Sequence, residues 1–231
     1  RRPFPAATTP TMKILPFTEK VSLDALDPAR TALLIVDMNV DFAHEGGGMF
    51  VPASAGILPQ VKRLAAACRA RGAPVLYAVH AHHKDGGDMG LTGRYREPIW
   101  ERKALIDGTP GVRVHPELQP QPGDVVFKKQ RHDAFYGTPL ELTARSLGLE
   151  SLIVVGTVSQ VCCESTVRAA FFRDLIPILI SDGVAPLPLP DVGYGAYSAE
   201  EVQRFTLTKL GAVYAKLATA ERALAWLGGE A

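Results

Sequence analysis

Short, continuously apolar runs alternate with segments of helical periodicity along most of the chain. The apolar runs cover residues 31–37 (TALLIVD), 74–80, 124–129, 151–157, 175–181 and 211–217. Helical patterns lie near residues 54–71, 138–147, 162–173 and 199–209, and a last short helix follows the final apolar run. Strands that are apolar on both faces are typical of parallel sheets, and β-α alternation with right-handed crossovers places such a sheet between helices. We therefore predict an α/β fold of three α/β/α layers, with a mostly parallel sheet of about six strands.

The remaining segments indicate how the chain is organised. Residues 1–16 are rich in Pro and Thr and show no periodicity, so we expect an N-terminal arm outside the core and one domain over residues 17–231. Two long irregular stretches, residues 81–123 and 183–197, interrupt the repeating pattern. Loops of that length commonly cover active sites.

Composition narrows the classes of partner and compartment. Lys plus Arg number 25 against 24 for Asp plus Glu, a net charge of +1 that argues against nucleic acid and anionic membranes and favours a small-molecule ligand. Three cysteines, two of them adjacent, make a poor disulfide framework and suit a reducing compartment. No apolar run approaches the roughly 20 residues of a membrane span. We expect a cytoplasmic protein.

Polar side chains follow several of the predicted strands. Asp37 ends the first strand, Lys128 and Lys129 end the strand at 124–129, and Cys162 follows a strand and a turn at the start of a helical pattern. Because ligands of open parallel sheets bind at the carboxyl ends of the strands, an acid, an amine and a thiol can meet at one edge. A helix start favours a thiolate and lowers a cysteine pKa, although a small buried residue is an equally good interpretation of Cys162.

Such a set of groups supports one specific chemistry. A carboxylate takes the thiol proton, the thiolate attacks a carbonyl carbon, and the protonated acid delivers its proton to a leaving amine. Water then hydrolyses the thioester. An amine held nearby stabilises both negative charges.

Three motifs resemble those of the isochorismatase-like cysteine hydrolase family, in order and over residues 28–220. They are LLIVDMNVDF (33–42), VVFKKQRHDAFYGTPLE (125–141) and VVGTVSQVCCESTVRAAF (154–171). The resemblance implies a Rossmann-like hydrolase fold and a triad of Asp37 as general base and acid, Lys129 as charge-holding partner and Cys162 as nucleophile. Spacing within the family motifs selects Lys129 over Lys128 and Cys162 over Cys163.

The same resemblance implies further features of the site. The N–H groups of Val158 and Cys162 would form an oxyanion hole, and a non-proline cis peptide bond would join Val158 to Ser159. It also implies a homodimer or homotetramer.

Substrate-binding candidates come from the motifs and the long loop. They are Asn39, Phe42, Trp100, Phe135 and Tyr136, with core packing as the default alternative for the aromatic residues. Relatives that are nicotinamidases place a metal beside the triad with an Asp-x-His pattern, but this chain has His80-Ala-His82-His83, with histidine in place of that aspartate. We expect no metal and no cofactor.

The segment around the proposed nucleophile is most similar to the ureidoacrylate and biuret type of amidohydrolase. We predict a cysteine-dependent amidohydrolase that cleaves a C–N bond of a small amide, ureido or carbamoyl compound. The alternatives are a metal-assisted, nicotinamidase-like amidase and a catalytically silent binding protein. A redox protein that uses Cys162 and Cys163 together is a further alternative, but adjacent cysteines form only a strained ring.

Overall fold

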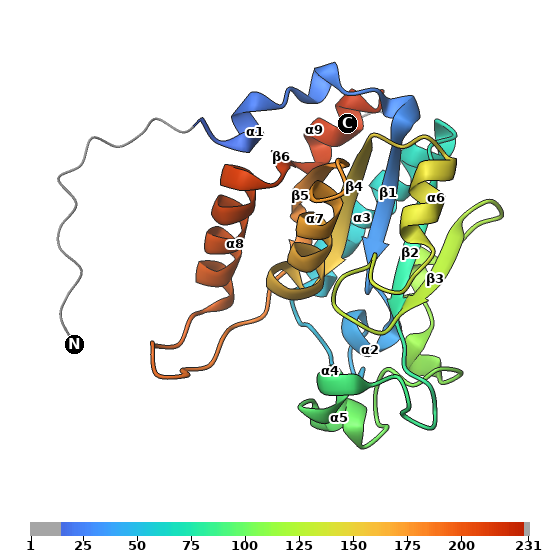
Figure 1. The fold of residues 1–231 in the computed structure, drawn as a ribbon, viewed down its shortest axis with the longest axis vertical. Helices are drawn as coiled ribbons and strands as arrows, with labels where there is room; N and C mark the ends of the chain where they lie inside the picture. Colours follow the sequence, from blue (N-terminus) through green and yellow to red (C-terminus); the bar gives the residue numbers. More distant parts are fainter. Residues whose placement is uncertain (1–14, 229–231) are drawn as a thin grey trace.

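Six parallel strands form one sheet in the order β3-β2-β1-β4-β5-β6. The computed structural model describes residues 15–228, so most of the predicted arm at 1–16 lies outside the described residues. The strands are β1 (Thr31–Val36), β2 (Val75–His80), β3 (Val125–Lys129), β4 (Ser151–Thr157), β5 (Ile176–Ala185) and β6 (Lys216–Ala218). All carboxyl ends point to the same edge of the sheet (Figure 1). The predicted parallel sheet is confirmed.

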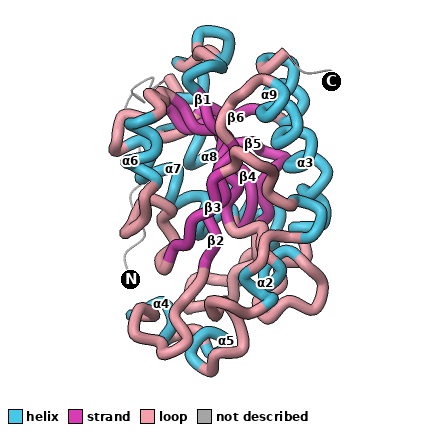
Figure 2. The backbone as a smooth tube through the Cα atoms, turned by 90° about the vertical axis from the view of Figure 1, so that its right-hand side faces the viewer, coloured by secondary structure: helices cyan, strands magenta, loops and turns pink. Residues whose placement is uncertain are grey.

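Helices cover both faces of the sheet (Figure 2). On one face α3 (Ser54–Ala70) and α9 (Ala220–Trp226) pack on the alternate strand positions that include Leu33 and Ile35. On the other face α6 (Leu140–Ser146), α7 (Glu164–Phe171) and α8 (Ala199–Val213) pack on those that include Leu34. Since both faces carry buried aliphatic side chains, the strands are continuously apolar, and the three-layer arrangement follows.

Short helices and loops cover the carboxyl edge of the sheet. α2 (Val40–Ala43) follows β1 directly, and the residues 81–123, which we call the cap segment, include α4 (Gly90–Arg94) and α5 (Glu97–Trp100). Figure 1 shows both cap helices beyond the strand ends, while α1 (Phe17–Lys20) lies at the opposite edge. The long loop at 81–123 therefore covers the edge at which ligands of such sheets bind.

Several predicted elements differ in their bounds. The strand predicted at 175–181 extends as β5 to Ala185, into the stretch 183–197 that was expected to be irregular. The apolar run at 211–217 does not form a strand throughout, because α8 continues to Val213 and β6 is confined to Lys216–Ala218. The buried positions Val202, Thr206 and Leu210 repeat every four residues, so the helical period extends into that run. The helix expected from residue 162 is preceded by a π-helical turn, Ser159–Cys163.

Among residues 15–228, no helix is both long and apolar enough to cross a membrane.

A glycine lets β4 approach β1 next to the strand ends. Gly156 pairs with Val36 and has a φ of +118°, and a Cβ placed on it would lie 2.0 Å from the Val36 carbonyl oxygen. A side chain here would force β4 away from β1 at the point where both strands deliver residues to the carboxyl edge.

We expect Gly156→Ala to lower the free energy of unfolding by about 3 kcal/mol or more, because a backbone clash adds to an unfavourable φ. Gly148→Ala is the matched control, since Gly148 also has a positive φ but its Cβ would meet nothing within 4 Å. Urea unfolding of both variants measures the difference. Equal losses of stability would show that the β1–β4 approach tolerates a side chain.

Candidate active site

Asp37 and Lys129 form a fully buried ion pair at the carboxyl edge of the sheet. Asp37 follows β1, Lys129 ends β3, and the Lys129 Nζ lies 2.8 Å from the Asp37 Oδ2, with both side chains 0% exposed. The neighbouring Lys128 is instead exposed and pairs with Asp107 at 2.7 Å. The structure therefore brings Lys129, and not Lys128, to the acid.

The backbone on either side holds Asp37 in place. Its own N–H donates to the Ala78 carbonyl oxygen at 2.9 Å, and its Oδ1 accepts from the His80 N–H at 2.9 Å. The Thr157 hydroxyl donates to the Asp37 carbonyl oxygen at 3.0 Å. Because β2 and β4 both bond to it, Asp37 keeps a φ of +52°, in a region that non-glycine residues seldom adopt.

Cys162 lies beside this pair. Ligand-type atoms of Asp37, His80 and Cys162 all lie within 4.8 Å of one another, and Cys162 is 3% exposed. Cys163 is fully buried in the apolar layer beneath α7. Cys162 belongs to the same apolar layer, but of the two adjacent thiols it is Cys162 that lines the cavity and joins the polar groups at the carboxyl edge.

The turn before Cys162 contains a cis peptide bond between Thr157 and Val158. The bond was expected one residue later, between Val158 and Ser159, so that expectation was wrong. The cis bond follows Thr157, the last residue of β4, directly at the point where the chain leaves the sheet for the π-helical turn. The Val158 carbonyl oxygen accepts from the N–H groups of Val161 and Cys163. The Cys162 N–H, between those two donors, does not bond to this oxygen.

The Cys162 thiol is neutral at ordinary pH. Burial raises its pKa to about 12, although the positive charge of Lys129 opposes this increase. The expected lowering by a helix start does not occur, because removal from water outweighs the favourable charges around the sulfur. Burial lowers the pKa of Lys129, but its interactions with the Asp37 carboxylate and the Cys162 sulfur outweigh burial, so that pKa is raised and the ammonium persists.

Two buried histidines extend from Lys129 toward the cap segment. Lys129 Nζ lies 3.4 Å from His80 Nδ1, and His80 Nε2 lies 3.1 Å from His82 Nε2. Because an ammonium only donates, His80 Nδ1 accepts and Nε2 carries the proton toward His82. His82 Nδ1 then faces Asp88 Oδ1 at 3.5 Å. Burial and the charge of Lys129 hold the His80 pKa well below its usual range, so the His80 ring is neutral.

The cluster of Asp37, His80 and Cys162 does not fit a metal ion. The Lys129 ammonium already lies 2.8 Å from Asp37 Oδ2 and 3.4 Å from His80 Nδ1. A metal ion among the same atoms would be repelled by this fixed positive charge. The Lys129 ammonium therefore takes the position that a metal ion would need beside Asp37 and His80.

A cavity of about 70 Å³ lies against Cys162. Its lining residues are Phe42, Met49, His80, Thr92, Arg96, Ile99, Leu105, His132, Val158, Val161, Cys162 and Leu187. Most of this wall is apolar, and the residues come from α2 and the loop after it, the end of β2, the cap segment and the loops after β3, β4 and β5. The cavity therefore accepts only a small molecule.

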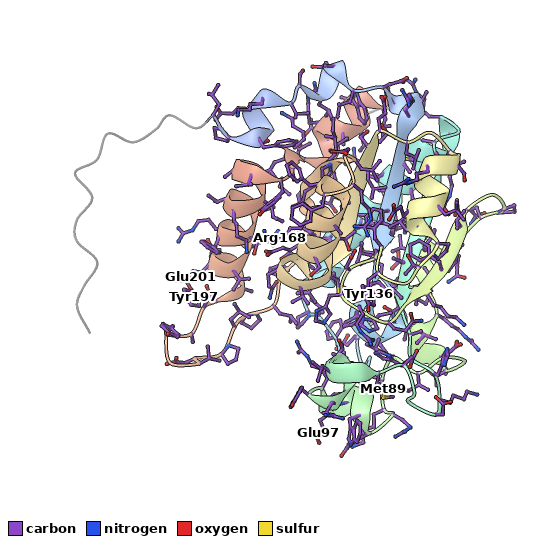
Figure 3. The ribbon with its side chains drawn as sticks, viewed as in Figure 1. Met89, Glu97, Tyr136, Arg168, Tyr197 and Glu201 are labelled. Atoms are coloured by element: carbon purple, nitrogen blue, oxygen red, sulfur yellow. The ribbon has the colours of Figure 1, made fainter. Side chains whose placement is uncertain are left out.

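The predicted substrate-binding residues occupy different positions. Phe42 lines the cavity, whereas Asn39 does not: its side chain is buried and donates to the Gly111 carbonyl oxygen at 2.9 Å. Phe135 is buried beneath the Arg173 guanidinium, 4.8 Å from its ring centre. Trp100 is 55% and Tyr136 63% exposed, and Figure 3 shows Tyr136 by the loop after β3. None of these last three residues lines the cavity in the described structure.

Several cavity residues were not predicted from the sequence. Thr92 and Arg96 lie in the cap segment, and Leu187 lies in the second long loop. His132 stands within the motif after β3, three residues beyond Lys129, and its place in the motif was the available signal. No sequence periodicity indicates that Thr92, Arg96 and Leu187 face a cavity.

The sequence pattern of the isochorismatase domain matches residues 31–221, well over half of the chain. A ureidoacrylate amidohydrolase from Methylobacterium radiotolerans is 34% identical, over 68% of this chain and 68% of its own length. A ureidoacrylate amidohydrolase from Agrobacterium fabrum is 30% identical, over 68% of this chain and 76% of its own.

Solved structures share the fold. A cysteine hydrolase from Pseudomonas syringae pv. phaseolicola superposes with a TM-score of 0.85 at 33% identity, over 88% of this chain and 94% of that one. An N-carbamoylsarcosine amidase from Thermoplasma acidophilum superposes with a TM-score of 0.65 at 22% identity, over 83% and 97%. At 22% identity, the similarity to the N-carbamoylsarcosine amidase shows a shared fold only.

We expect Lys129→Met to lower the free energy of unfolding by about 3–5 kcal/mol, because it leaves the Asp37 carboxylate buried without a partner. Asp37→Asn combined with Lys129→Met removes both charges, and we expect it to recover part of that loss. Urea unfolding of the single and double variants measures the effect. Lys128→Met is the exposed control, and a loss no greater in Lys129→Met than in this control would contradict the prediction.

Alkylation of Cys162 should depend steeply on pH. Because burial raises the thiol pKa to about 12, only the small thiolate fraction reacts, and this fraction grows as the pH rises toward the pKa. We expect the iodoacetamide rate at Cys162 to rise about tenfold per unit from about pH 6 to about pH 9, without a plateau. Mass spectrometry in a Cys163→Ala background follows the reaction. A plateau that begins in this range would indicate a thiolate at rest.

Proposed function

The chain belongs to the isochorismatase family, and we propose that it is a cysteine-dependent amidohydrolase. Its substrate would be a small amide, ureido or carbamoyl compound, and its product ammonia or an amine. The observation that supports this proposal is the buried Asp37–Lys129 pair beside the Cys162 thiol, at the wall of a small cavity. The similarity to ureidoacrylate amidohydrolases supports the class of reaction.

The first half of the proposed reaction forms a thioester. Asp37 takes the proton of the Cys162 thiol as the sulfur attacks the carbonyl carbon, so that an S–C bond forms and the carbonyl oxygen becomes an oxyanion. The oxyanion collapses, the C–N bond breaks, and the leaving nitrogen takes the proton from Asp37. The nitrogen leaves as ammonia or an amine.

The second half restores the thiol. A water molecule gives a proton to Asp37 and attacks the thioester carbonyl, the C–S bond breaks, and the sulfur regains the proton from Asp37. The acid is released as product. Every proton passes through one carboxylate, which agrees with the contacts of Asp37 to both the lysine and the thiol region.

The raised pKa of Cys162 gives Asp37 its proposed role. A thiol whose pKa is about 12 does not supply a thiolate unaided near neutral pH, so a base must accept the proton during attack. Lys129 would stabilise the negative charge wherever it resides, on the carboxylate before proton transfer or on the sulfur after it.

The turn before Cys162 provides donors for the oxyanion. We propose that the N–H groups of Val158 and Cys162 form the oxyanion hole. Both residues line the cavity, and the Cys162 N–H does not bond to the Val158 carbonyl oxygen that its neighbours use. Fixed backbone donors in a site sheltered from water stabilise developing negative charge strongly.

We expect ammonia release from at least one member of a panel of ureidoacrylate, biuret, N-carbamoylsarcosine, maleamate and nicotinamide. Cys162→Ala should lower the rate by about 10³-fold or more, because it removes the nucleophile. Cys163→Ala is the matched control and should remain active, since that thiol does not line the cavity. Hydroxylamine, which captures thioesters, should yield a hydroxamate with the wild-type protein and with Cys163→Ala, but not with Cys162→Ala.

The same panel decides between the proposed function and its alternatives. Activity on nicotinamide alone that requires added metal would favour a nicotinamidase-like enzyme. Activity that survives in Cys162→Ala would exclude the cysteine mechanism. Tight binding of a panel member without turnover would favour a binding protein.

A further inference from the structure

Arg96 is the one permanently charged residue among those that line the cavity beside Cys162. His80 and His132 also line it, but burial and nearby positive charges, including that of Lys129, hold the pKa of both rings below the usual range. Behind the wall, the charges of Asp37 and Lys129 offset each other. At neutral pH the cavity therefore carries a net positive charge that comes from Arg96.

The guanidinium of Arg96 has no partner among the residues that the structure describes. Other arginines near the cap segment are occupied: Arg102 donates to the Lys84 carbonyl oxygen at 3.0 Å, and Arg131 donates to the Asp88 carbonyl oxygen at 2.8 Å. A guanidinium presents a planar fork of donors that matches a carboxylate. At Arg96 this fork remains free at the cavity wall.

The backbone holds Arg96 in a defined place between α4 and α5. Its N–H donates to the Gly93 carbonyl oxygen at 3.0 Å, and its own carbonyl oxygen accepts from Ile99 and Trp100, each at 2.9 Å. Met89 and Ile99 are 2% and 1% exposed and anchor this part of the cap segment in the core. Met89 and Glu97 mark the two cap helices in Figure 3.

The rest of the wall defines what kind of molecule fits. Thr92, one turn before Arg96, adds a hydroxyl donor, while Phe42, Ile99 and Leu105 are apolar. A suitable ligand has an anionic group for Arg96, a short apolar spacer, and a carbonyl carbon near Cys162. The small volume, about 70 Å³, excludes bulky chains between the two ends.

We propose that Arg96, assisted by the Thr92 hydroxyl, binds a carboxylate of the substrate, so that the protein acts on ureido or amido acids in preference to neutral amides. This inference rests on the proposed amidohydrolase function, since the scissile carbonyl must lie at Cys162. Arg96 is then a specificity-determining residue that takes no part in the bond-breaking steps.

The first test compares 3-ureidopropanoate with N-propylurea, which has the same ureido group and a methyl in place of the carboxylate. We expect the wild type to prefer the acid, and Arg96→Met to lower kcat/KM for the acid by about tenfold to a hundredfold through KM, as loss of a charged hydrogen-bonded pair predicts. The rate on N-propylurea should not change. Arg94→Met is the matched control, because both arginines are exposed on the same segment but only Arg96 lines the cavity.

The second test does not require turnover. Iodoacetate and iodoacetamide alkylate a thiol through the same leaving group but differ in charge, so the ratio of their rates at Cys162 reports the charge of the cavity. In a Cys163→Ala background, Arg96→Met should slow iodoacetate several-fold relative to iodoacetamide, whereas Arg94→Met should not. The iodoacetamide rate also verifies that each variant is folded.

The outcomes separate this inference from the proposed function. Hydrolysis of acid and neutral compounds with equal kcat/KM, or a preference that Arg96→Met leaves intact, would overturn the role of Arg96 and leave the amidohydrolase. Absence of any hydrolysis together with a changed alkylation ratio would overturn the amidohydrolase and retain an anion-binding Arg96. An unchanged alkylation ratio in Arg96→Met would exclude anion binding by this side chain at the cavity.

Discussion

The buried ion pair of Asp37 and Lys129 is the interaction on which the arrangement at the carboxyl edge depends. Removing both charges from water costs several kcal/mol for each ion, which only close contact and further hydrogen bonds can offset. The His80 N–H on Asp37 and the Arg131 carbonyl oxygen on Lys129, at 3.1 Å, supply such bonds. Because these donors and acceptors come from β1, β2 and β3, the pair is satisfied only when all three strands are in register.

The pair also determines the charge state of the thiol beside it. Asp37 and Lys129 cancel each other, so Cys162 experiences little net charge, and burial dominates its pKa. A resting neutral thiol is protected from adventitious oxidants, which attack thiolates. In the proposed reaction, the Cys162 thiol loses its proton to Asp37 only when a substrate carbonyl carbon is present for the sulfur to attack.

The sequence predicts the parts of the site that strands deliver and misses those that loops deliver. Asp37 and the adjacent Lys128 and Lys129 are predictable because an apolar run marks each strand and its carboxyl end must reach one common edge, whereas the choice of Lys129 rests on the resemblance to the family motif. Cys162 follows from the same rule. Arg96 reaches the cavity only through packing of the cap segment, and the exposed Trp100 has the same local signals as a buried aromatic residue. Likewise, the raised thiol pKa depends on burial by residues distant in sequence.

The two cationic side chains near Cys162, Lys129 and Arg96, differ in burial and in pairing, and this difference suits them to different roles. Lys129 is buried and paired, so its charge is already used, and it adds little attraction for an incoming anion. Arg96 lines the wall, is exposed and has no partner among residues 15–228, so its donors are available to a ligand. A carboxylate that approached Lys129 would displace Asp37 and remove the proposed base. In the proposed function, an anion-binding Arg96 on the cap segment would keep an acidic substrate away from Lys129 on β3, and so from the ion pair on which hydrolysis would depend.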